Sequence, residues 1–254
     1  MKTALQLIVF IAAFVFTSYQ PAQDASAQNL PGNKSGINAD TLVANSIRLY
    51  VYPLPENSFP ALTQIRPLKT DTTILLCAAA AFTRLDNGNV DGLFAVNGVL
   101  NGTVSKRLGG GCIISDQQPF VKMFATRDAT LLTKGWVDSA IVSKKVSFFQ
   151  QLQLVRDSLP LRYGKDISLF QRRALVTFTN SSRKPAVIES AAEITLQQFA
   201  DALSQLDVKD AIYLDMGAWD EGWIRTTDGK QRTIGLIRSQ TARQCNWLVF
   251  KKFE

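Results

Sequence analysis

The sequence contains no histidine. This absence excludes Ser-His-Asp and Cys-His catalytic triads, zinc sites of the HExxH and three-histidine types, and acid–base catalysis by an imidazole. Acid–base chemistry in this chain must therefore come from Asp, Glu, Lys, Tyr or Cys side chains.

Cysteine is scarce, with Cys77, Cys112 and Cys245 as its three occurrences. An odd number allows at most one internal disulfide. The CxxC spacing is missing, and three cysteines without histidine make a poor zinc set. A catalytic cysteine would lack its usual histidine base. Cys77 and Cys112 lie in apolar or Gly-rich runs, where free buried cysteines are common.

A hydrophobic run long enough to cross a membrane is also missing. Residues 4–16 form an apolar run of about 13 residues, whereas a spanning helix needs about 20. Lys2 precedes this run, and Ala25-Ser26-Ala27 has the form of a signal-peptidase site. We therefore expect a signal peptide at residues 1–27 and a secreted or periplasmic protein without stable membrane insertion.

The 254 residues include 46% hydrophobic and 19% charged residues, the profile of a folded globular protein. Lys and Arg number 28 and Asp and Glu 21, which gives a formal charge of +7. The basic residues are spread along the chain rather than clustered, and no nucleic-acid-binding motif is visible, so we expect no nucleic-acid partner.

Strand-like segments recur along the chain. They cover residues 46–53, 93–100, 112–115, 121–125, 174–179, 212–215, 233–239 and 247–253. The apolar run at 72–82 fits either a buried strand or a short helix. Helical spacing predicts a helix at 195–206, where Thr195 and Gln198 fit a capping box, and a second helix at 148–154.

These elements predict an α+β fold, a single strand-rich domain with mixed or antiparallel sheets and a few packed helices. Residues 28–42 are polar and rich in Gly and Asn, so we expect a flexible segment before a domain at 43–254. The run of Gly at 109–111 lacks the Lys-Ser/Thr of a phosphate loop and is better interpreted as a turn.

The densest polar cluster lies at residues 210–225, DAIYLDMGAWDEGWIR. An apolar strand ends at Asp215, Gly217 allows a tight backbone path, and Asp220, Glu221, Trp219 and Trp223 follow. Carboxylates at a strand end are candidates for acid–base catalysis, and indole rings stack on sugars. The alternative is that Asp215 closes a turn, the other acids are solvated, and the Trp side chains only pack.

The order of three segments resembles the phosphodiester glycosidase family. That family shows an Asn-Gly-Gly-aromatic motif, an Arg-x-Ala strand, a helix, and then a strand ending Leu-Asp-Gly-Gly-Gly-Ser. Residues 79–82 stand at the first motif, Arg172-Arg173-Ala174 begins the middle strand, and the predicted helix at 195–206 leads into Leu214-Asp215-Met216-Gly217. Ala replaces the first-motif Asn and Gly residues, and Met216 and Ala218 replace two later glycines.

The resemblance implies a hydrolase that cleaves a sugar-1-phosphodiester, with Asp215 as catalytic group and Arg172 holding the phosphate. Local chemistry adds Asp220 or Glu221 as a second carboxylate, and Gly217, Trp219, Trp223 and Asn97 as residues that contact substrate. One of Arg172 and Arg173 should be solvated, because neighbours on a strand face opposite sides.

The expected partner is a small glycan or sugar phosphate. No cofactor is expected and no metal site is indicated, although the carboxylates could hold a divalent cation. The alternative function is a non-catalytic carbohydrate- or envelope-binding protein on the same scaffold. The oligomeric state is not indicated by the sequence.

Overall fold

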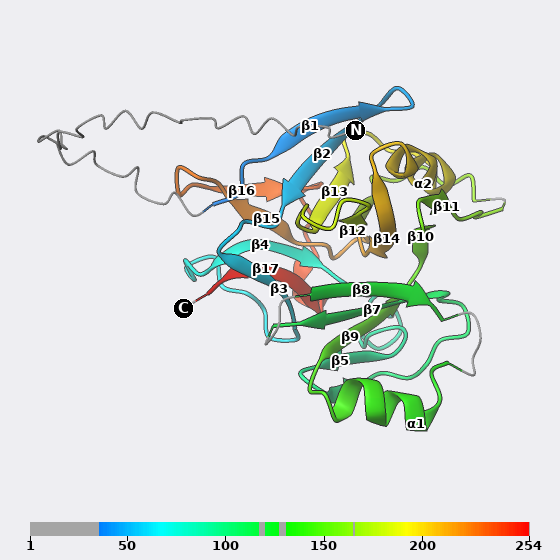
Figure 1. Ribbon diagram of the computed structural model, residues 1–254. Helices are drawn as coiled ribbons and strands as arrows, with labels where there is room; N and C mark the ends of the chain where they lie inside the picture. The colour runs from blue at the N-terminus through cyan, green and yellow to red at the C-terminus, as the bar shows by residue number, and fades with distance from the viewer. Residues whose placement is uncertain (1–35, 117–119, 127–130, 165, 254) are drawn as a thin grey trace, which may run out of the picture. The chain divides into compact units, whose positions relative to one another are not determined.

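The computed structural model describes residues 36–116, 120–126, 131–164 and 166–253 (Figure 1). The predicted signal peptide lies outside these residues. The predicted flexible segment is described only from residue 36, and its last part is built into the fold. Ile37 is buried and bridges to Thr226, and the first strand starts at Asp40, before the expected boundary at 43.

The strands of the described residues form three antiparallel sheets. The largest has seven strands, in the order β1 (Asp40–Ala44), β2 (Ile47–Pro53), β13 (Ala186–Ser190), β12 (Arg173–Phe178), β14 (Val208–Leu214), β10 (Gln153–Arg156) and β11 (Leu159–Pro160). A five-stranded sheet follows the order β16 (Gln231–Ile234), β15 (Gly222–Arg225), β4 (Ile74–Ala79), β17 (Trp247–Lys252) and β3 (Ser58–Thr63). The third has β6 (Val99–Asn101), β5 (Phe94–Val96), β9 (Ser147–Gln151), β7 (Gly110–Ser115) and β8 (Phe120–Ala125).

Helices are few among the described residues. They comprise α1 (Lys134–Val137), which continues as a π-helix at Asp138–Val142, α2 (Leu196–Ser204) and a 3₁₀ turn at Thr241–Arg243. The α2 helix lies beside β10 and β14, and the α1 segment lies beside the third sheet (Figure 1). The fold is thus mostly β, and it agrees only roughly with the predicted α+β class.

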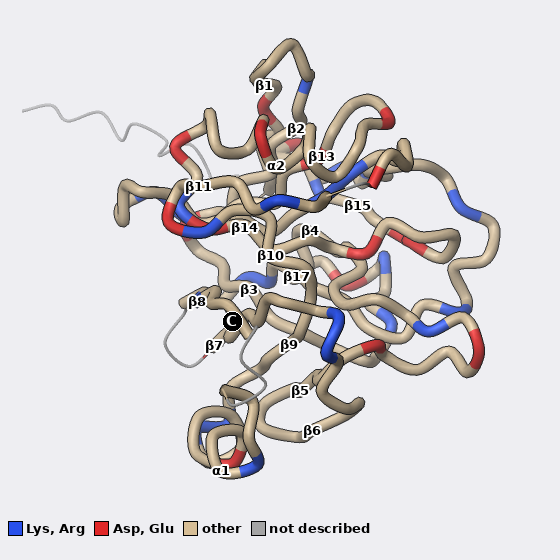
Figure 2. Tube along the Cα trace, turned by 90° about the vertical axis from the view of Figure 1, so that its right-hand side faces the viewer, with Lys and Arg blue, Asp and Glu red and all other residues tan. Residues whose placement is uncertain are grey.

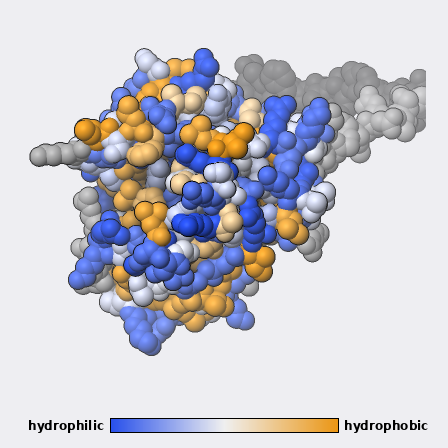
Figure 3. Space-filling view, turned by 180° about the vertical axis from the view of Figure 1, so that it is seen from behind, coloured by the Kyte–Doolittle hydropathy of each residue, from blue (hydrophilic) through white to orange (hydrophobic). Residues whose placement is uncertain are grey.

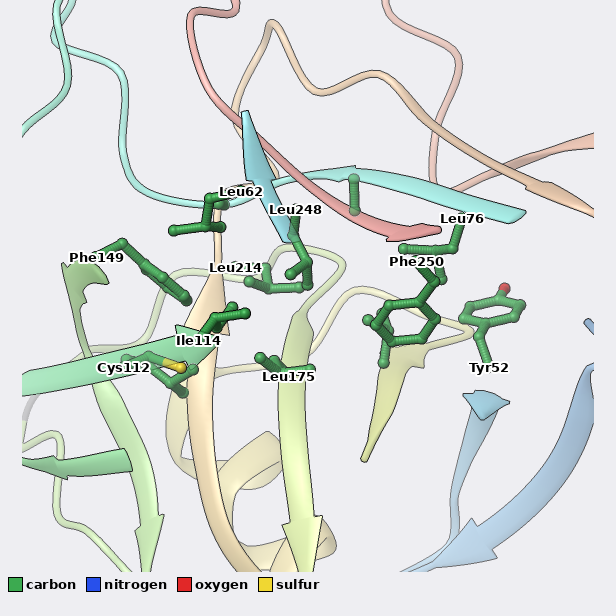
Figure 4. Close-up of a cluster of buried hydrophobic side chains, with 14 of the residues drawn as sticks. Tyr52, Leu62, Leu76, Cys112, Ile114, Phe149, Leu175, Leu214, Leu248 and Phe250 are labelled. Atoms are coloured by element: carbon green, nitrogen blue, oxygen red, sulfur yellow. The ribbon is translucent and has the colours of Figure 1, made fainter. Parts of the chain in front are cut away.

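The main core joins all three sheets (Figure 4). Leu76 and Phe250 come from the five-stranded sheet that contains β4 and β17, which we call the middle sheet. Leu175 and Leu214 come from the seven-stranded sheet and Phe149 from the third sheet, and all five are fully buried. Hydrophobic and hydrophilic residues alternate in small areas on the face shown in Figure 3. Acidic and basic positions are likewise interspersed along the chain trace in Figure 2.

Residues 74–79 of the run at 72–82 form the strand β4, which settles the choice left open by the sequence. All six residues of β4 are buried, because β15 and β17 pair with its two edges and core side chains cover both faces. A strand buried on both faces has no polar alternation, so its sequence cannot be distinguished from a short buried helix.

Three predictions about local structure are wrong. The strand predicted at 233–239 ends at Ile234, where Gly235 takes a positive φ of 71°. Residues 148–154 form β9 and the start of β10 instead of a helix, since the buried residues of β9 fill both faces of the third sheet. The strand predicted at 93–100 is a hairpin, because Asn97 and Gly98 adopt positive φ values of 49° and 82° and form its two-residue turn.

Candidate functional site

Two of the segments singled out in the sequence meet where β4 and β14 end. The backbone N–H of Asp215 donates to the carbonyl of Ala80 at 3.0 Å, which fixes the end of β14 against the segment that follows β4. Just before this link, the rings of Tyr213 and Phe82 lie 5.8 Å apart. The predicted first and last motifs therefore form one structural unit.

Backbone donors hold the Asp215 carboxylate in place. Its Oδ1 accepts from the N–H of Gly217 at 2.9 Å, and its Oδ2 accepts from the N–H of Thr83 at 3.3 Å. Burial raises the pKa of this carboxyl to about 6, the two backbone donors lower it, and the charge of Asp220 raises it further. A carboxyl with a pKa near neutrality is suited to exchange protons with a substrate or water.

Asp215 lines a cleft of about 440 Å³. Of the predicted site residues, Gly217 and Trp219 line the same cleft. Its other charged lining residues were not predicted from the sequence, namely Arg84, Asp86, Asp91 and Arg107. Arg84 could have been found from its place two residues after the first motif, whereas Arg107 and Asp91 are brought in by the fold.

The two arginines of the cleft are paired but exposed. Arg84 Nη2 lies 2.8 Å from Asp86 Oδ2, and Arg107 Nη2 lies 2.9 Å from Asp91 Oδ2. Exposed pairs of this kind are worth little in stability, so an anionic ligand can compete for the guanidinium groups at small cost.

Trp219 lines the cleft with only 6% of its surface exposed. Its indole N–H donates to Gln240 Oε1 at 3.2 Å, and the guanidinium of Arg243 lies 5.7 Å from its ring centroid. The ring is therefore fixed in position at the wall of the cleft, where it offers a limited apolar contact.

Arg172 and Arg173 are both buried, so the prediction that one of them is solvated is wrong. Arg172 Nε donates to the carbonyl of Ile194 at 3.1 Å, and Nη2 donates to that of Ser168 at 2.7 Å. Its guanidinium lies 6.0 Å from the ring centroid of Tyr213. Arg172 thus packs against the Tyr213 ring and is not a lining residue of the Asp215 cleft, so it is not placed to hold a phosphate there.

Asp220 belongs to a buried ion network. Arg173 Nη1 lies 2.8 Å from Asp220 Oδ1, and Arg173 Nη2 lies 2.6 Å from Glu189 Oε2. Burial opposes the charge on Arg173, but the two carboxylates hold its pKa above the usual value. The Asp220 carboxylate is therefore engaged in holding the structure together, away from the surface of the cleft.

The remaining predicted site residues lie elsewhere. Glu221 pairs with Arg66 at 2.5 Å and with Lys69 at 3.3 Å. Trp223 is buried on β15 against Cys77 and Trp247. Asn97 sits in the β5–β6 turn, where its amide oxygen accepts from the Ser147 hydroxyl. The structure does not bring these three residues to Asp215.

The three cysteines are free, and Cys77 and Cys112 are buried as predicted. Within the described ranges, no group of three or more Cys, Asp and Glu side chains is arranged to hold a metal ion. In the same ranges, no helix has the length and hydrophobicity needed to cross a membrane.

Comparison with known proteins shows that this chain has a fold similar to that of solved structures. No protein-family model matches the chain, and no curated protein matches its sequence. Among solved structures, it is similar to the catalytic domain of zebrafish N-acetylglucosamine-1-phosphodiester alpha-N-acetylglucosaminidase, with a TM-score of 0.52 at 13% identity over 86% of this chain and 82% of that one. The shared feature is the fold.

A second solved structure has a similar fold. It is a hypothetical protein from Synechocystis, with a TM-score of 0.55 and 12% identity. The match covers 85% of this chain but only 62% of the other.

Proposed function

We propose that this protein is a hydrolase of the phosphodiester glycosidase type, which acts on a sugar-1-phosphodiester. One observation carries the proposal: the Asp215 carboxyl, with its pKa raised to about 6, lies in a cleft that also contains two exposed arginines. The fold it shares with a phosphodiester glycosidase catalytic domain supports the same assignment.

In the proposed reaction, water attacks the anomeric carbon of the sugar. The bond from that carbon to the phosphate oxygen breaks, and its electron pair leaves with the phosphate. Asp215 acts as general base and takes a proton from the attacking water. The products are a free sugar and a phosphomonoester.

The two arginines would bind the phosphate as it gains charge. Arg84 and Arg107 present exposed guanidinium groups, which pair with the exposed Asp86 and the half-buried Asp91 respectively. A phosphate leaving group needs little protonation, so the Asp215 carboxyl suffices for the base role. Trp219 would contact the apolar face of the sugar.

The proposal includes export of the protein after cleavage of residues 1–27, which rests on the sequence. It also retains a second candidate, a carbohydrate-binding protein without turnover. Met216 and Ala218, which replace glycines of the family motif, favour this second candidate because their side chains limit the approach of a phosphate to the backbone.

Hydrolysis of a panel of sugar-1-phosphodiesters tests the proposal. Asp215→Asn should lower turnover at least about 100-fold, since it removes the base. Asp207→Asn is the matched control, because Asp207 is exposed and its positive φ of 55° suits Asn. Equal turnover by wild type and Asp215→Asn would refute the assigned role. Absence of turnover with sugar phosphate still bound would favour the second candidate.

A further inference from the structure

A second pocket, of about 310 Å³, adjoins the Asp215 cleft. The two share Arg107 as a lining residue. Its polar lining residues include Lys106, Thr126, Gln153 and Tyr163. This volume lies at the lower end of the range for ligand pockets, about 300–1,000 Å³, and suits a ligand of monosaccharide size.

Gln153 at this pocket has an unusual environment. The side chain is 1% exposed, yet neither Nε2 nor Oε1 has a hydrogen-bond partner among the described residues. Leaving a buried polar atom without a partner costs about 1–3 kcal/mol. Both amide atoms lie buried beside the pocket without a partner in the described part of the chain, so a rotation of the Gln153 side chain toward the pocket would let them bind the hydroxyl groups of a ligand.

Gln150, three residues earlier, shows the opposite arrangement. Its Oε1 accepts from the backbone N–H groups of Leu93 and Ser105, at 3.2 and 2.9 Å. Its Nε2 donates to the carbonyls of Ser105 and Leu108, at 2.7 and 2.9 Å. Gln150 therefore fixes the loop that carries Lys106 and Arg107, so that this wall of the pocket is formed before a ligand arrives.

The Gly run at 109–111, which the sequence suggested was only a turn, follows this loop and also borders the pocket. Gly109 lines the pocket, and Gly110 begins β7. A Cβ on Gly110 would lie 2.8 Å from Gln153 Cβ and 2.9 Å from the carbonyl oxygen of Gln151. Only glycine lets β7 approach the Gln153 backbone this closely.

The charged side chains that line this pocket are both cations, and Arg107 also pairs with Asp91 of the neighbouring cleft. Lys106 and Arg107 are exposed, and the described lining residues include no carboxylate. The pocket thus combines a neutral amide at a buried position with two cations at an exposed one. This arrangement fits a ligand with hydroxyl groups at one end and an anionic group at the other.

We propose that this pocket binds a phosphorylated monosaccharide, with the Gln153 amide bound to sugar hydroxyls and Lys106 and Arg107 bound to the phosphate. The identity of this ligand rests on the proposed function, because a sugar phosphate is a fragment of the proposed substrate. Arg107 then connects the bound phosphate to the cleft of Asp215.

Calorimetric titration with glucose 1-phosphate at low ionic strength tests the proposal, with glucose and inorganic phosphate as separate probes. The wild type should bind glucose 1-phosphate more tightly than either fragment. Gln153→Leu should weaken this binding at least about 10-fold and should fold with unchanged or higher stability, because it removes an unpartnered buried amide. Gln151→Leu is the matched control, since Gln151 is equally buried and does not line the pocket.

Lys106→Ala adds a second test that does not alter the interior. It should weaken binding of glucose 1-phosphate and reduce its dependence on salt, because one exposed cation is lost. Equal affinity of wild type and Gln153→Leu, or no binding of glucose 1-phosphate by the wild type, would overturn the inference. Binding that depends on Gln153 without any hydrolysis would refute the proposed function and leave the pocket assignment standing.

Discussion

At the level of single residues, the Asp215 carboxyl connects stability with chemistry. Its pKa is raised from 3.8 to about 6, chiefly by burial. Because the folded state then holds the proton more tightly than the unfolded state, ionisation of this group destabilises the fold. The same property that makes Asp215 a base near neutral pH therefore carries a cost in folding free energy.

This link predicts a pH-dependent difference between the wild type and Asp215→Asn. The stabilising contribution of Asp215 is fully present below about pH 4 and is lost as the pH rises through about 6. The free energy of unfolding of the wild type, relative to the variant, should fall by an amount on the order of 2 kcal/mol between pH 4 and pH 8. Urea unfolding of both proteins across this range measures it.

Asp228 provides the control for this experiment. It is exposed, and the Thr226 hydroxyl holds its pKa at about 2, so it stays ionised throughout the range tested. The difference between the wild type and Asp228→Asn should be constant from pH 4 to pH 8. A constant difference for Asp215→Asn as well would contradict a raised pKa at Asp215.

At the level of elements, the best-defined local signal is the start of α2. Thr195 Oγ1 accepts from the N–H of Gln198 at 3.1 Å, and the N–H of Thr195 donates to Gln198 Oε1 at 2.9 Å. These reciprocal bonds confirm the predicted capping box. They satisfy backbone donors that the first turn of the helix would leave unpaired.

Thr195→Ala should therefore lower the free energy of unfolding by about 1 kcal/mol. Because α2 packs its buried face against β10 and β14, the loss should appear in the global unfolding transition. Urea denaturation followed by circular dichroism measures this loss. Thr70→Ala serves as the control, since Thr70 is an exposed turn residue and its replacement should leave the midpoint unchanged.

The secondary-structure elements differ in how well the sequence alone predicts them. The capping residues of α2 act through neighbours in the chain, so their pattern identified the helix. The hairpin at Asn97-Gly98 was missed, because the flanking strands of three residues are too short to show a period. Residues 148–154 were misassigned because burial on both faces of β9 comes from partners far away in the sequence.

The candidate site was predictable to a similar degree. Asp215, Gly217 and Trp219 lie near one another in the chain, and the fold places all three at one cleft. Arg107 and Gln153 come from other sheets and loops, and no local pattern marked them. Asp220 was expected to be a second catalytic carboxylate, and one of Arg172 and Arg173 was expected to be solvated. Only the packing of two sheets shows that Asp220 and Arg173 are buried and neutralise each other.

At the level of the whole molecule, the buried network around Arg173 joins two sheets. Arg173 and Glu189 belong to the seven-stranded sheet, whereas Asp220 precedes β15 of the middle sheet. Gly222 and Gly235 make room for the guanidinium, since a Cβ on either would lie 2.9 or 2.6 Å from Arg173 Nη2. The network thus depends on the correct docking of both sheets.

Arg173→Met should destabilise the protein by about 3–5 kcal/mol, because it leaves two carboxylates buried without their cation. The midpoint of urea unfolding measures the loss. Arg48→Met is the matched control, since Arg48 is an exposed arginine on β2 of the same sheet and its replacement should have little effect. A midpoint close to that of the wild type for Arg173→Met would show that the network contributes little to stability.

The Gly110 contact has a consequence for redesign of the Gln153 pocket. At Gly110, β7 packs directly against residues 151–153, so no larger side chain fits there. Substitutions elsewhere in the pocket should therefore leave the shape of this wall unchanged. The preceding loop at 104–108 carries the exposed side chains of Val104, Lys106 and Arg107 on a frame fixed by Gln150. New ligand preferences would therefore be selected from libraries confined to Val104, Lys106 and Arg107, with the glycines and Gln150 left untouched.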